Sequence, residues 1–332
     1  MTDERGRLAE RRPALEGRAR VRSALRRWFE AEGFLEVETP ARVPSPGQET
    51  HLDAIPSGDL WLVTSPEYAM KRLCAAGYEK IVSIGKCWRA DERGPHHEPE
   101  FTMIEWYRAN EPLGRIADDC EALVRLAAAA VVADAGADGP VGQGGARLPD
   151  APFARVTVRE VMDRFAGLAL DGDEHAAALA AKARGAGIDL GTATEWDDIF
   201  FQVWLDRVEP RLAELGPAFV FDWPAPLGAL ARRRADDPRF VERFELYADG
   251  IELANAFGEL TDPVEQRARF EAERAARRAR GKAIYPIDER LLAALPAMPV
   301  TAGVALGFDR LVMLVLGATS LAEVTAFAAN EI

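Results

Sequence analysis

The clearest alternation of apolar and polar positions lies in residues 100–107, at the end of the stretch WRADERGPHHEPEFTMIEWY. A period of two predicts a strand with Phe101, Met103, Glu105 and Tyr107 on one face and Thr102, Ile104 and Trp106 on the other. An earlier strand over 81–89 ends on Arg89, and a polar loop containing His97 joins the two strands. A guanidinium for phosphate oxygens beside an aromatic face suits a triphosphate and a flat base. An ordinary hairpin with a charged turn is the alternative.

The N-terminal part predicts a helix followed by a short strand. Apolar residues at helical spacing predict a helix over 15–31, which Gly33 ends. A strand over 34–39 follows, closed by Pro40. Residues 1–13 form a polar lead without periodicity, and residues 41–60, rich in Pro, Gly and Ser, predict a surface loop.

Residues 61–73, WLVTSPEYAMKRL, predict a strand that runs into a helix. Ser65 is a plausible N-cap, Pro66 takes the first helical position, and Glu67 lies in the first turn. Glu67 could therefore be a capping carboxylate that the helix dipole favours, as well as a ligand-binding group.

The middle of the chain predicts mainly helices and carries no chemical motif. A helix over 111–135 precedes a Gly/Pro-rich loop over 136–152. Short helical patterns follow over 157–166, 173–185 and 195–214. We interpret about 111–215 as a helical insertion within a single domain spanning 1–332.

Residues 219–223 predict a strand, and residues 242–257 predict a hairpin with its turn at Asp249-Gly250. This turn would place Glu252 opposite Tyr247 and Glu245 opposite Ala254. Glu245 and Glu252 would then be diagonal neighbours, roughly 7–8 Å apart. Two carboxylates so placed and otherwise unpaired would repel each other, so a cation between them is expected. Two solvated carboxylates on an open sheet face are the alternative.

The C-terminal part contains a charged helix and a glycine-interrupted strand. Residues 261–282 predict a helix with a solvated, ion-paired surface. Residues 302–317, AGVALGFDRLVMLVLG, predict a strand that turns into an apolar helix, with Arg310 at the junction. Small residues there allow a ligand to approach the backbone closely.

Composition narrows the class of protein. A net charge of -13 over 332 residues argues against a broad basic surface for nucleic acid. Three widely spaced cysteines form no disulfide or zinc pattern, and no apolar segment is long enough to span a bilayer. We expect a cytoplasmic protein.

Together these stretches resemble the catalytic core of the class II aminoacyl-tRNA synthetases, most closely the lysyl branch. GFLEVETP resembles motif 1, WRADERGPHHEPEFTMIEWY motif 2 and GVALGFDR motif 3, while TSPEYAMKRL and GIELANAFGELTD resemble lysine-site segments. The resemblance implies an α+β fold, an antiparallel β-sheet flanked by helices. Motif 1 begins near residue 15, so we expect no OB-fold anticodon-binding domain and no tRNA recognition. A free-standing core of this kind, with Ala305 where lysyl-tRNA synthetases usually have Gly, resembles the elongation factor P–(R)-β-lysine ligase family.

That resemblance implies ATP, Mg²⁺ and (R)-β-lysine as ligands, elongation factor P as the protein acceptor, and a homodimer formed through motif 1. Arg89 and Arg310 would be the catalytic residues, holding the α-phosphate and covering adenine and the γ-phosphate, while Glu245 and Glu252 would bind Mg²⁺. The implied ATP site also includes Asp91, His97, Glu98, Phe101, Glu252, Leu253 and Gly307. The implied amino-acid site comprises Ser65, Glu67, Tyr107, Asn255, Phe257, Glu259 and Ala305.

Strict alternation would put Glu252 on the face opposite Asn255, Phe257 and Glu259. If all four serve one site, the strand must bulge or twist near 253–255.

Four positions depart from the family pattern. Asp91 replaces a usual Glu, Glu98 replaces an Asn near adenine, Ala256 replaces a Gly, and Gly258 lies where a larger residue often sits. None of these changes removes a charged group that the chemistry needs, so we expect an active enzyme. A synthetase paralogue that activates α-lysine for another acceptor, and a catalytically silent subunit, are the competing hypotheses.

Overall fold

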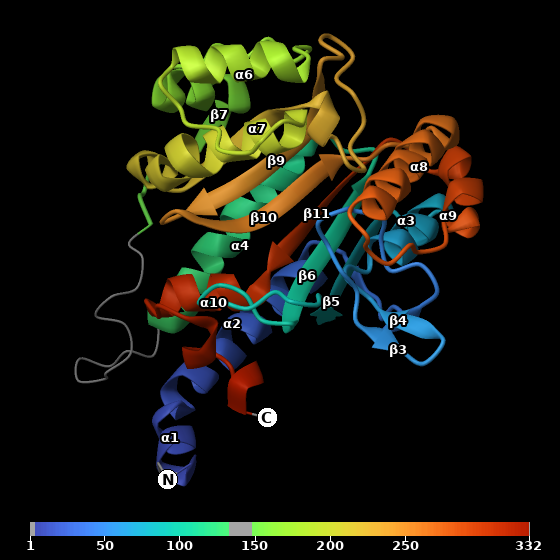
Figure 1. Cartoon of the computed structure of the whole chain (residues 1–332). Coiled ribbons are helices and arrows are strands. Elements are labelled where there is room, and N and C mark those ends of the chain that lie inside the picture. Colours follow the sequence, from blue (N-terminus) through green and yellow to red (C-terminus); the bar gives the residue numbers. More distant parts are fainter. Residues whose placement is uncertain (1–3, 133–147, 332) are drawn as a thin grey trace. The chain divides into compact units, whose positions relative to one another are not determined.

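The computed structural model describes residues 4–132 and 148–331. Its contacts divide the chain into two units (Figure 1). The first unit comprises residues 1–147 and 261–332, and the second comprises residues 148–260. Of the predicted loop over 136–152, residues 136–147 lie outside the described residues, and 148–152 contain neither helix nor strand.

The first unit contains a four-stranded sheet, a small three-stranded sheet and seven α-helices among its described residues. Its helices are α1 (Glu4–Glu10), α2 (Arg12–Ala31), α3 (Glu67–Ala75), α4 (Leu113–Val132), α8 (Pro263–Ala279), α9 (Glu289–Ala294) and α10 (Phe308–Leu316). Helix α1 has only seven residues, and none of them is buried. The larger sheet has the order β1 (Leu35–Glu36), β5 (Lys80–Trp88), β6 (Glu100–Ala109) and β11 (Thr301–Gly307). The smaller sheet has the order β2 (Arg42–Val43), β4 (Leu60–Leu62) and β3 (Pro56–Ser57).

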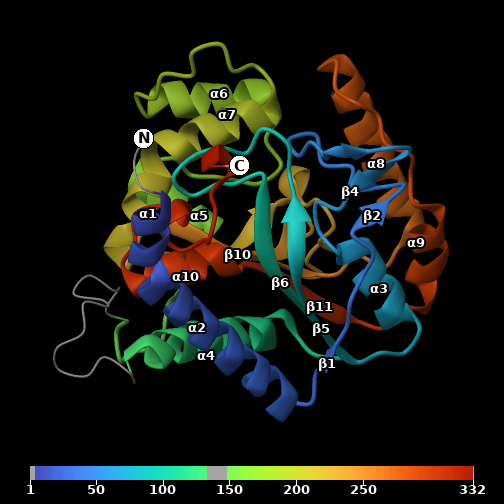
Figure 2. The same ribbon diagram turned by 90° about the horizontal axis from the view of Figure 1, so that it is seen from below.

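Strand β6 separates a helix-covered face from a face that carries polar side chains. On the covered face, Trp106 packs edge-on against Phe29 of α2 at 5.4 Å between ring centroids. Arg108, on the same face, donates to Asp119 of α4 at 2.6 and 3.0 Å. Helices α2 and α4 lie side by side there (Figure 2). The predicted alternation of β6 is therefore confirmed, and Phe101, Met103, Glu105 and Tyr107 share the other face.

Three predictions for the first unit are wrong. Residues 4–10 are helical instead of forming an irregular lead, and α2 already begins at Arg12 with a proline in its first turn. Residues 41–60 are not simply a surface loop, because Ser45, Gln48 and Thr50 are buried. The predicted strand over 34–39 is reduced to the two residues of β1.

Helix α8 explains the burial of residues 45–54. Its Arg277 is 0% exposed and donates to the carbonyl oxygens of Glu49 and Leu52 at 2.9 and 2.8 Å. The same guanidinium donates to Asp53 at 2.6 Å and lies over the Tyr285 ring at 4.3 Å. The prediction of a solvated, ion-paired surface for this helix is therefore wrong for Arg277, which is buried because it satisfies backbone oxygens that would otherwise be buried alone.

The second unit combines a four-stranded sheet with a helical layer. The sheet order is β10 (Ile251–Gly258), β9 (Phe240–Ala248), β8 (Ala218–Pro224) and β7 (Ala154–Thr157). The helices are α5 (Val158–Val161), α6 (Ala176–Gly185) and α7 (Trp196–Val203), with π-helical turns at Met162–Ala166 and Trp204–Val208 and 3₁₀ turns at Glu209–Leu215 and Ala225–Leu227. The helical layer packs through Phe200 and Trp204 onto Trp223 of β8. The predicted helical patterns and the predicted strand over 219–223 are confirmed.

The β9–β10 hairpin has the predicted turn. Asp249 and Gly250 both have positive φ, 52° and 73°, as a two-residue hairpin turn requires. Glu252 lies opposite Tyr247, but the register then shifts between Glu252 and Ala254. The bulge expected near 253–255 is confirmed. It also makes one pairing prediction wrong, because Glu245 lies opposite Asn255 instead of Ala254.

Both units fit the predicted α+β class. Strand pairs are antiparallel except for β1–β5 and β7–β8, which are parallel. Among the residues that the structure describes, no helix is both long and apolar enough to cross a membrane.

Candidate active site

Arg89 and Phe101 lie together in the first unit, where β5 leads into the loop of residues 89–99. The Arg89 N–H donates to the Pro99 carbonyl at 2.9 Å, which fixes the base of the loop. The Arg89 guanidinium lies 5.1 Å from the centre of the Phe101 ring and 3.5 Å from Glu92. Within the described part of the chain, the buried Nε of Arg89 has no hydrogen-bond acceptor. The structure thus places a cation with spare donor capacity next to a stacking surface.

His97 and Arg310 also lie together, although 213 residues separate them. Arg310 is in the first turn of α10, directly after β11 ends at Gly307. Its Nη2 is 2.7 Å from His97 Nε2, and its Nε donates to the His96 carbonyl at 3.1 Å. The first unit therefore collects two arginines, a histidine and an aromatic ring around the 89–99 loop, a set that suits polyphosphate oxygens and a base.

Two departures from the family pattern lie in the same loop. Asp91 is exposed and has φ 62°, a left-handed conformation that Asp tolerates better than most residues. Glu92, rather than Asp91, supplies the carboxylate beside Arg89. Glu98 accepts a hydrogen bond from the Ala329 N–H at 3.1 Å. Its carboxylate therefore has a partner within the protein.

The polar face of β6 carries Glu105, which was not among the predicted site residues. Glu105 is 2% exposed and accepts hydrogen bonds from the Ser65 and Tyr107 hydroxyls, both at 2.6 Å. Ala305 of β11 lies directly opposite Glu105 in the sheet. Alternation already placed Glu105 between Phe101 and Tyr107, so the signal was present in the sequence. Three predicted residues thus surround a buried carboxylate that can bind an ammonium group.

Glu67 has a structural partner as well as a possible ligand role. It begins α3, and its carboxylate is 2.6 Å from the Lys71 ammonium one turn later. The Ser65 hydroxyl accepts from the Glu67 N–H at 3.1 Å, as the side chain of a predicted N-cap should, although α3 itself begins at Glu67. Glu49 lies in the same region. Burial and the nearby Glu67 charge raise the pKa of Glu49, and Arg89 lowers it. No sequence pattern pointed to Glu49.

In the second unit, the bulge places four predicted residues on one face of the β9–β10 hairpin: Glu245, Glu252, Asn255 and Phe257. Glu252 lies opposite Tyr247, and Asn255 lies opposite Glu245. Phe257 lies opposite Arg243, whose guanidinium is 5.7 Å from the Phe257 ring centre. A regular strand would have turned Glu252 to the other face, so the bulge is what makes a common site possible.

Glu245 has a cationic partner, and the expectation of an otherwise unpaired carboxylate is wrong. Arg243 Nη2 donates to Glu245 Oε1 at 2.5 Å, and the Tyr247 hydroxyl donates to Oε2 at 2.5 Å. Arg243 also donates to Asn255 Oδ1 at 3.1 Å and to the Leu227 carbonyl at 2.6 Å. The side chain at 243 therefore organises this face.

The remaining predicted residues of this hairpin are buried. Leu253 is 2% exposed and Glu259 is 1% exposed. Ala256 is fully buried and lies opposite Phe244. Gly258 accommodates the Arg232–Glu242 ion pair, because a Cβ at 258 would lie only 2.6 Å from Glu242 Oε2 and 3.1 Å from Arg232 Cζ. The absence of a larger residue at Gly258 thus has a steric reason.

The two carboxylates of this face fit a magnesium ion bound mainly by phosphate oxygens. Within residues 4–132 and 148–331, no three His, Cys, Asp or Glu side chains gather as a metal-binding group. Mg²⁺ is commonly held by one or two carboxylates together with substrate phosphates and water. A carboxylate that accepts two hydrogen bonds still has lone pairs for a cation. Glu245 and Glu252 therefore suit this mode of binding.

The ionisation of Glu245 leads to a stability prediction for the metal-free protein. Burial raises the pKa of Glu245 to about 7, Arg243 opposes the shift, and Glu252 adds to it. A free Glu titrates at about 4.3. The folded protein therefore holds the Glu245 proton more tightly than the unfolded chain does. The contribution of this proton to the free energy of unfolding is complete below about pH 4.3 and is lost as the pH rises through about 7. In urea unfolding between pH 5 and 8, we expect the Glu245→Gln variant to gain stability relative to the natural protein as the pH rises. A constant difference between the two proteins would contradict this assignment.

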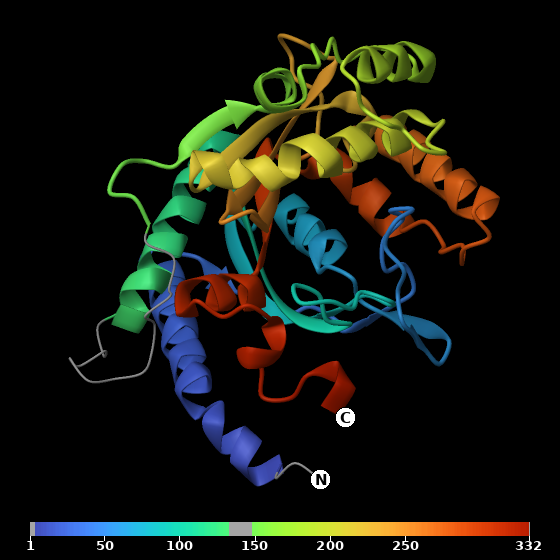
Figure 3. The ribbon, with the colours of Figure 1, turned by 60° about the vertical axis from the view of Figure 1, so that its left-hand side comes forward.

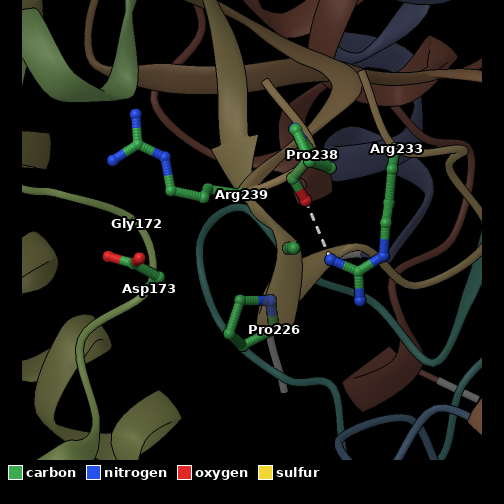
Figure 4. A pocket seen from close by; sticks show the side chains of 7 residues that line it. Gly172, Asp173, Pro226, Arg233, Pro238 and Arg239 are labelled. Carbon is green, nitrogen blue, oxygen red and sulfur yellow. Dashed lines mark hydrogen bonds between the residues drawn. The ribbon is translucent and has the colours of Figure 1, made fainter. Parts of the chain in front are cut away.

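A pocket of about 500 Å³ elsewhere in the second unit contains none of these residues. It is lined by Gly172, Asp173, Ala225, Pro226, Arg233, Pro238 and Arg239. Arg233 donates to the Pro238 carbonyl at 2.9 Å, and Arg239 pairs with Asp237 at 2.8 Å. The two guanidinium groups lie well apart in Figure 4, and the Arg233 group is directed to the Pro238 carbonyl, so they do not converge on a common ligand.

Comparison with known proteins identifies the family of this chain. The sequence matches the class II tRNA synthetases (D, K and N) over residues 6–331. The elongation factor P–(R)-β-lysine ligase of Erwinia tasmaniensis is 40% identical over 327 residues, which covers 95% of this chain and 94% of the relative. The proteins of the same name from Vibrio cholerae and Salmonella gallinarum are both 38% identical, with 94% and 96% of each chain covered.

The chain therefore belongs to the class II tRNA synthetase family. Within that class, it belongs with the elongation factor P–(R)-β-lysine ligases, its relatives over nearly their full length. The predicted fold class and family are both confirmed.

Proposed function

We propose that this chain is a ligase that activates (R)-β-lysine with ATP and transfers it to a lysine side chain of elongation factor P. The observation that carries the proposal is identity of 38–40% over nearly the whole length of three relatives that bear this name. The buried Glu105 with its two hydroxyl donors, and the arginines of the 89–99 loop and α10, supply groups for an amine and for a triphosphate.

The reaction has two steps. An oxygen of the β-lysine carboxylate attacks the α-phosphorus of ATP, and pyrophosphate leaves. The ε-amine of the acceptor lysine then attacks the carbonyl carbon of the adenylate, loses a proton and displaces AMP, so that an amide bond forms. Neither step needs an enzyme nucleophile, so catalysis consists of positioning and electrostatic stabilisation.

Arg89 holds the α-phosphate and the substrate carboxylate, and offsets the negative charge that develops at phosphorus. Phe101 stacks on adenine, while His97 and Arg310 bind the outer phosphates, with Arg310 also covering the other adenine face. Bound at Glu245 and Glu252, Mg²⁺ would neutralise phosphate charge.

The amino groups of β-lysine are cationic and require carboxylates. Glu105 and Glu259 are buried, which strengthens their interaction with an ammonium group. Glu67 and Glu49 lie near Arg89 in the first unit and add carboxylates for a substrate that carries two amines. Ser65 and Tyr107 orient Glu105, and the Ala305 methyl lies across the sheet from it, where it can discriminate between lysine isomers.

We further propose a cytoplasmic homodimer formed through motif 1, which acts on a protein acceptor and not on tRNA. The edge strand β1 of motif 1 exposes Leu35 to 51%, an apolar side chain that a second copy could cover. The acidic balance of the chain gives no broad surface for tRNA.

The test is ATP–pyrophosphate exchange by the purified protein with (R)-β-lysine, (S)-β-lysine, α-lysine or no amino acid. We expect exchange that depends on (R)-β-lysine, followed by a mass increase of elongation factor P by one lysyl group. Preference for α-lysine would instead indicate a lysine-activating paralogue with another acceptor. Absence of exchange with every isomer, in folded protein with Mg²⁺, would indicate a silent subunit.

A further inference from the structure

The chain after α10 returns to the 89–99 loop. We call residues 321–331 the C-terminal clasp; in Figures 1 and 3 this red segment runs back toward the blue N-terminal helices. The Leu321 N–H donates to the Pro95 carbonyl at 2.8 Å. The Ala329 N–H donates to the Glu98 carboxylate at 3.1 Å. Two points of the clasp thus hold the loop on either side of His97.

The far end of the clasp is fixed to the start of α2. Arg11 donates to both oxygens of Glu331, at 2.6 and 2.7 Å, and to the Ala326 carbonyl at 3.0 Å. Arg7 adds a longer contact to Glu331 at 3.3 Å. The Glu331 side chain is only 8% exposed, and its Oε2 also accepts from the Ala328 N–H at 2.9 Å. This bidentate pair fixes the turn that presents the Ala329 N–H.

The clasp is also packed, so its position does not depend on polar contacts alone. Leu321, Val324 and Ala328 are 3%, 0% and 2% exposed. The pKa of Glu331 is lowered to about 2, mainly by the hydrogen bond from Arg11. The ion pair is therefore intact at neutral pH, where activity is measured.

The loop between these two attachments carries the His97 side chain. Arg310 contacts that side chain at 2.7 Å and the His96 carbonyl at 3.1 Å. The loop is consequently held from two directions, by α10 through Arg310 and by the clasp through Pro95 and Glu98. A hydrogen bond to a carboxylate is stronger than one to a neutral amide oxygen, which gives Glu98 a reason to replace the usual Asn.

We propose that the C-terminal clasp positions the 89–99 loop for ATP, with Glu98, Arg11 and Glu331 acting as positioning residues. The inference rests on the proposed function, because it assumes that this loop binds ATP. It assigns a role to the Arg11–Glu331 pair, which touches no proposed ligand group. It also predicts that disturbing the pair affects ATP binding and leaves amino-acid binding unchanged.

The experiment compares Arg11→Glu, Glu331→Arg and the double charge-swapped variant in ATP–pyrophosphate exchange. Each single variant should raise the KM for ATP about tenfold, the size of losing a hydrogen bond to a charged group. The KM for (R)-β-lysine should stay within about twofold, because the described contacts of the clasp reach the loop at Pro95 and Glu98, whereas Arg89 is fixed at the base of the loop by Pro99. The double variant should recover most of the ATP affinity, since the pair is restored with its charges reversed.

A matched control tests whether any broken ion pair has the same effect. Arg267 and Glu289 form a similar bidentate pair between α8 and α9, and both side chains are about half exposed. The corresponding charge reversals there should leave the KM for ATP unchanged. Glu98→Gln, which keeps an acceptor oxygen, should be affected less than Glu98→Ala.

Hydrogen exchange of the amides in residues 93–99 reads loop position directly and needs no catalysis. Exchange should speed up in both single variants of the Arg11–Glu331 pair and return toward the natural rate in the double variant. Unchanged loop protection in the single variants would overturn the inference, as would an equal rise in both KM values. If the natural protein shows no pyrophosphate exchange, the proposed function fails, and the hydrogen-exchange result still decides whether the clasp orders the loop.

Discussion

Replacing Arg89 with alanine is expected to reduce (R)-β-lysine-dependent ATP–pyrophosphate exchange by about 10²–10³-fold, the usual cost of losing a donor that stabilises developing charge. The guanidinium lies beside Phe101, and its buried Nε has no acceptor among the described residues. The side chain is therefore available to oxygens of a ligand. Because the negative charge at phosphorus peaks in the transition state, the loss should appear mainly in kcat.

Two further variants separate charge from geometry at this position. Arg89→Lys keeps the positive charge but loses the planar fork, so we expect an intermediate activity. Arg93→Ala removes an exposed arginine from the same loop and should change exchange little. Melting temperatures should be similar for all three variants, because the Arg89–Glu92 ion pair is long, at 3.5 Å, and both side chains are partly exposed. A loss of activity in Arg93→Ala equal to that in Arg89→Ala would show that net loop charge, and not the placement of Arg89, matters.

The sequence predicts those elements whose structure is decided locally. Strand β6 has a strict period of two, and the Asp249-Gly250 turn needs two positive φ angles that this pair readily adopts. The bulge after Glu252 was also predictable, but by a different route. It followed from requiring Glu252, Asn255 and Phe257 to share a face, a constraint that comes from chemistry and not from periodicity.

Two of the failures share one physical cause, contacts between residues far apart in the sequence. Residues 45–54 were predicted as part of a surface loop, because their Pro, Gly and Ser content is typical of one. Their burial depends on Arg277 and on Glu273, which accepts from the Thr50 N–H at 2.7 Å across 223 residues. Glu98 also has a partner that its local sequence does not indicate, since Ala329, whose N–H it binds, is 231 residues away. Local patterns contain no information on such partners.

Glu245 is a different kind of failure, because its missed partner is local. The register was predicted well enough to bring Glu245 and Glu252 together, yet the cation next to Glu245 was missed. Arg243 lies two residues earlier on the same strand and therefore on the same face. Applying the alternation to β9 as well as to β10 would have found it. The metal assignment consequently rests on the chemistry of two carboxylates, one of which already has a cationic neighbour.

The largest stability effect is expected for Arg243→Met, which should destabilise the protein by about 3–5 kcal/mol, the cost of removing one partner of a buried ion pair. The Arg243 and Glu245 side chains are 12% and 8% exposed. The substitution leaves the Glu245 carboxylate with only the Tyr247 hydroxyl of the two donors described here, and it removes the donor to Asn255. It also removes a guanidinium that lies 4.4 Å from the Trp223 ring centre. A calorimetric melting curve at pH 8, where Glu245 of the natural protein is mostly ionised, would measure the loss.

The double variant Arg243→Met with Glu245→Gln shows whether the buried charge is the cause. Neutralising Glu245 removes the charge that lost its partner, so the double variant should be more stable than Arg243→Met alone. Arg211→Met is the matched control, because Arg211 and Glu214 form a half-exposed ion pair in the same unit, and such pairs contribute about 0–1 kcal/mol. A double variant no more stable than Arg243→Met would place the loss in packing against Trp223 and Phe257 instead. Whether charge or packing causes the loss of stability, ATP–pyrophosphate exchange should stay low in both Arg243 variants. Arg243 holds Asn255 in the proposed substrate site and Glu245 in the proposed magnesium site. The same guanidinium therefore stabilises the fold and positions two residues of the proposed site.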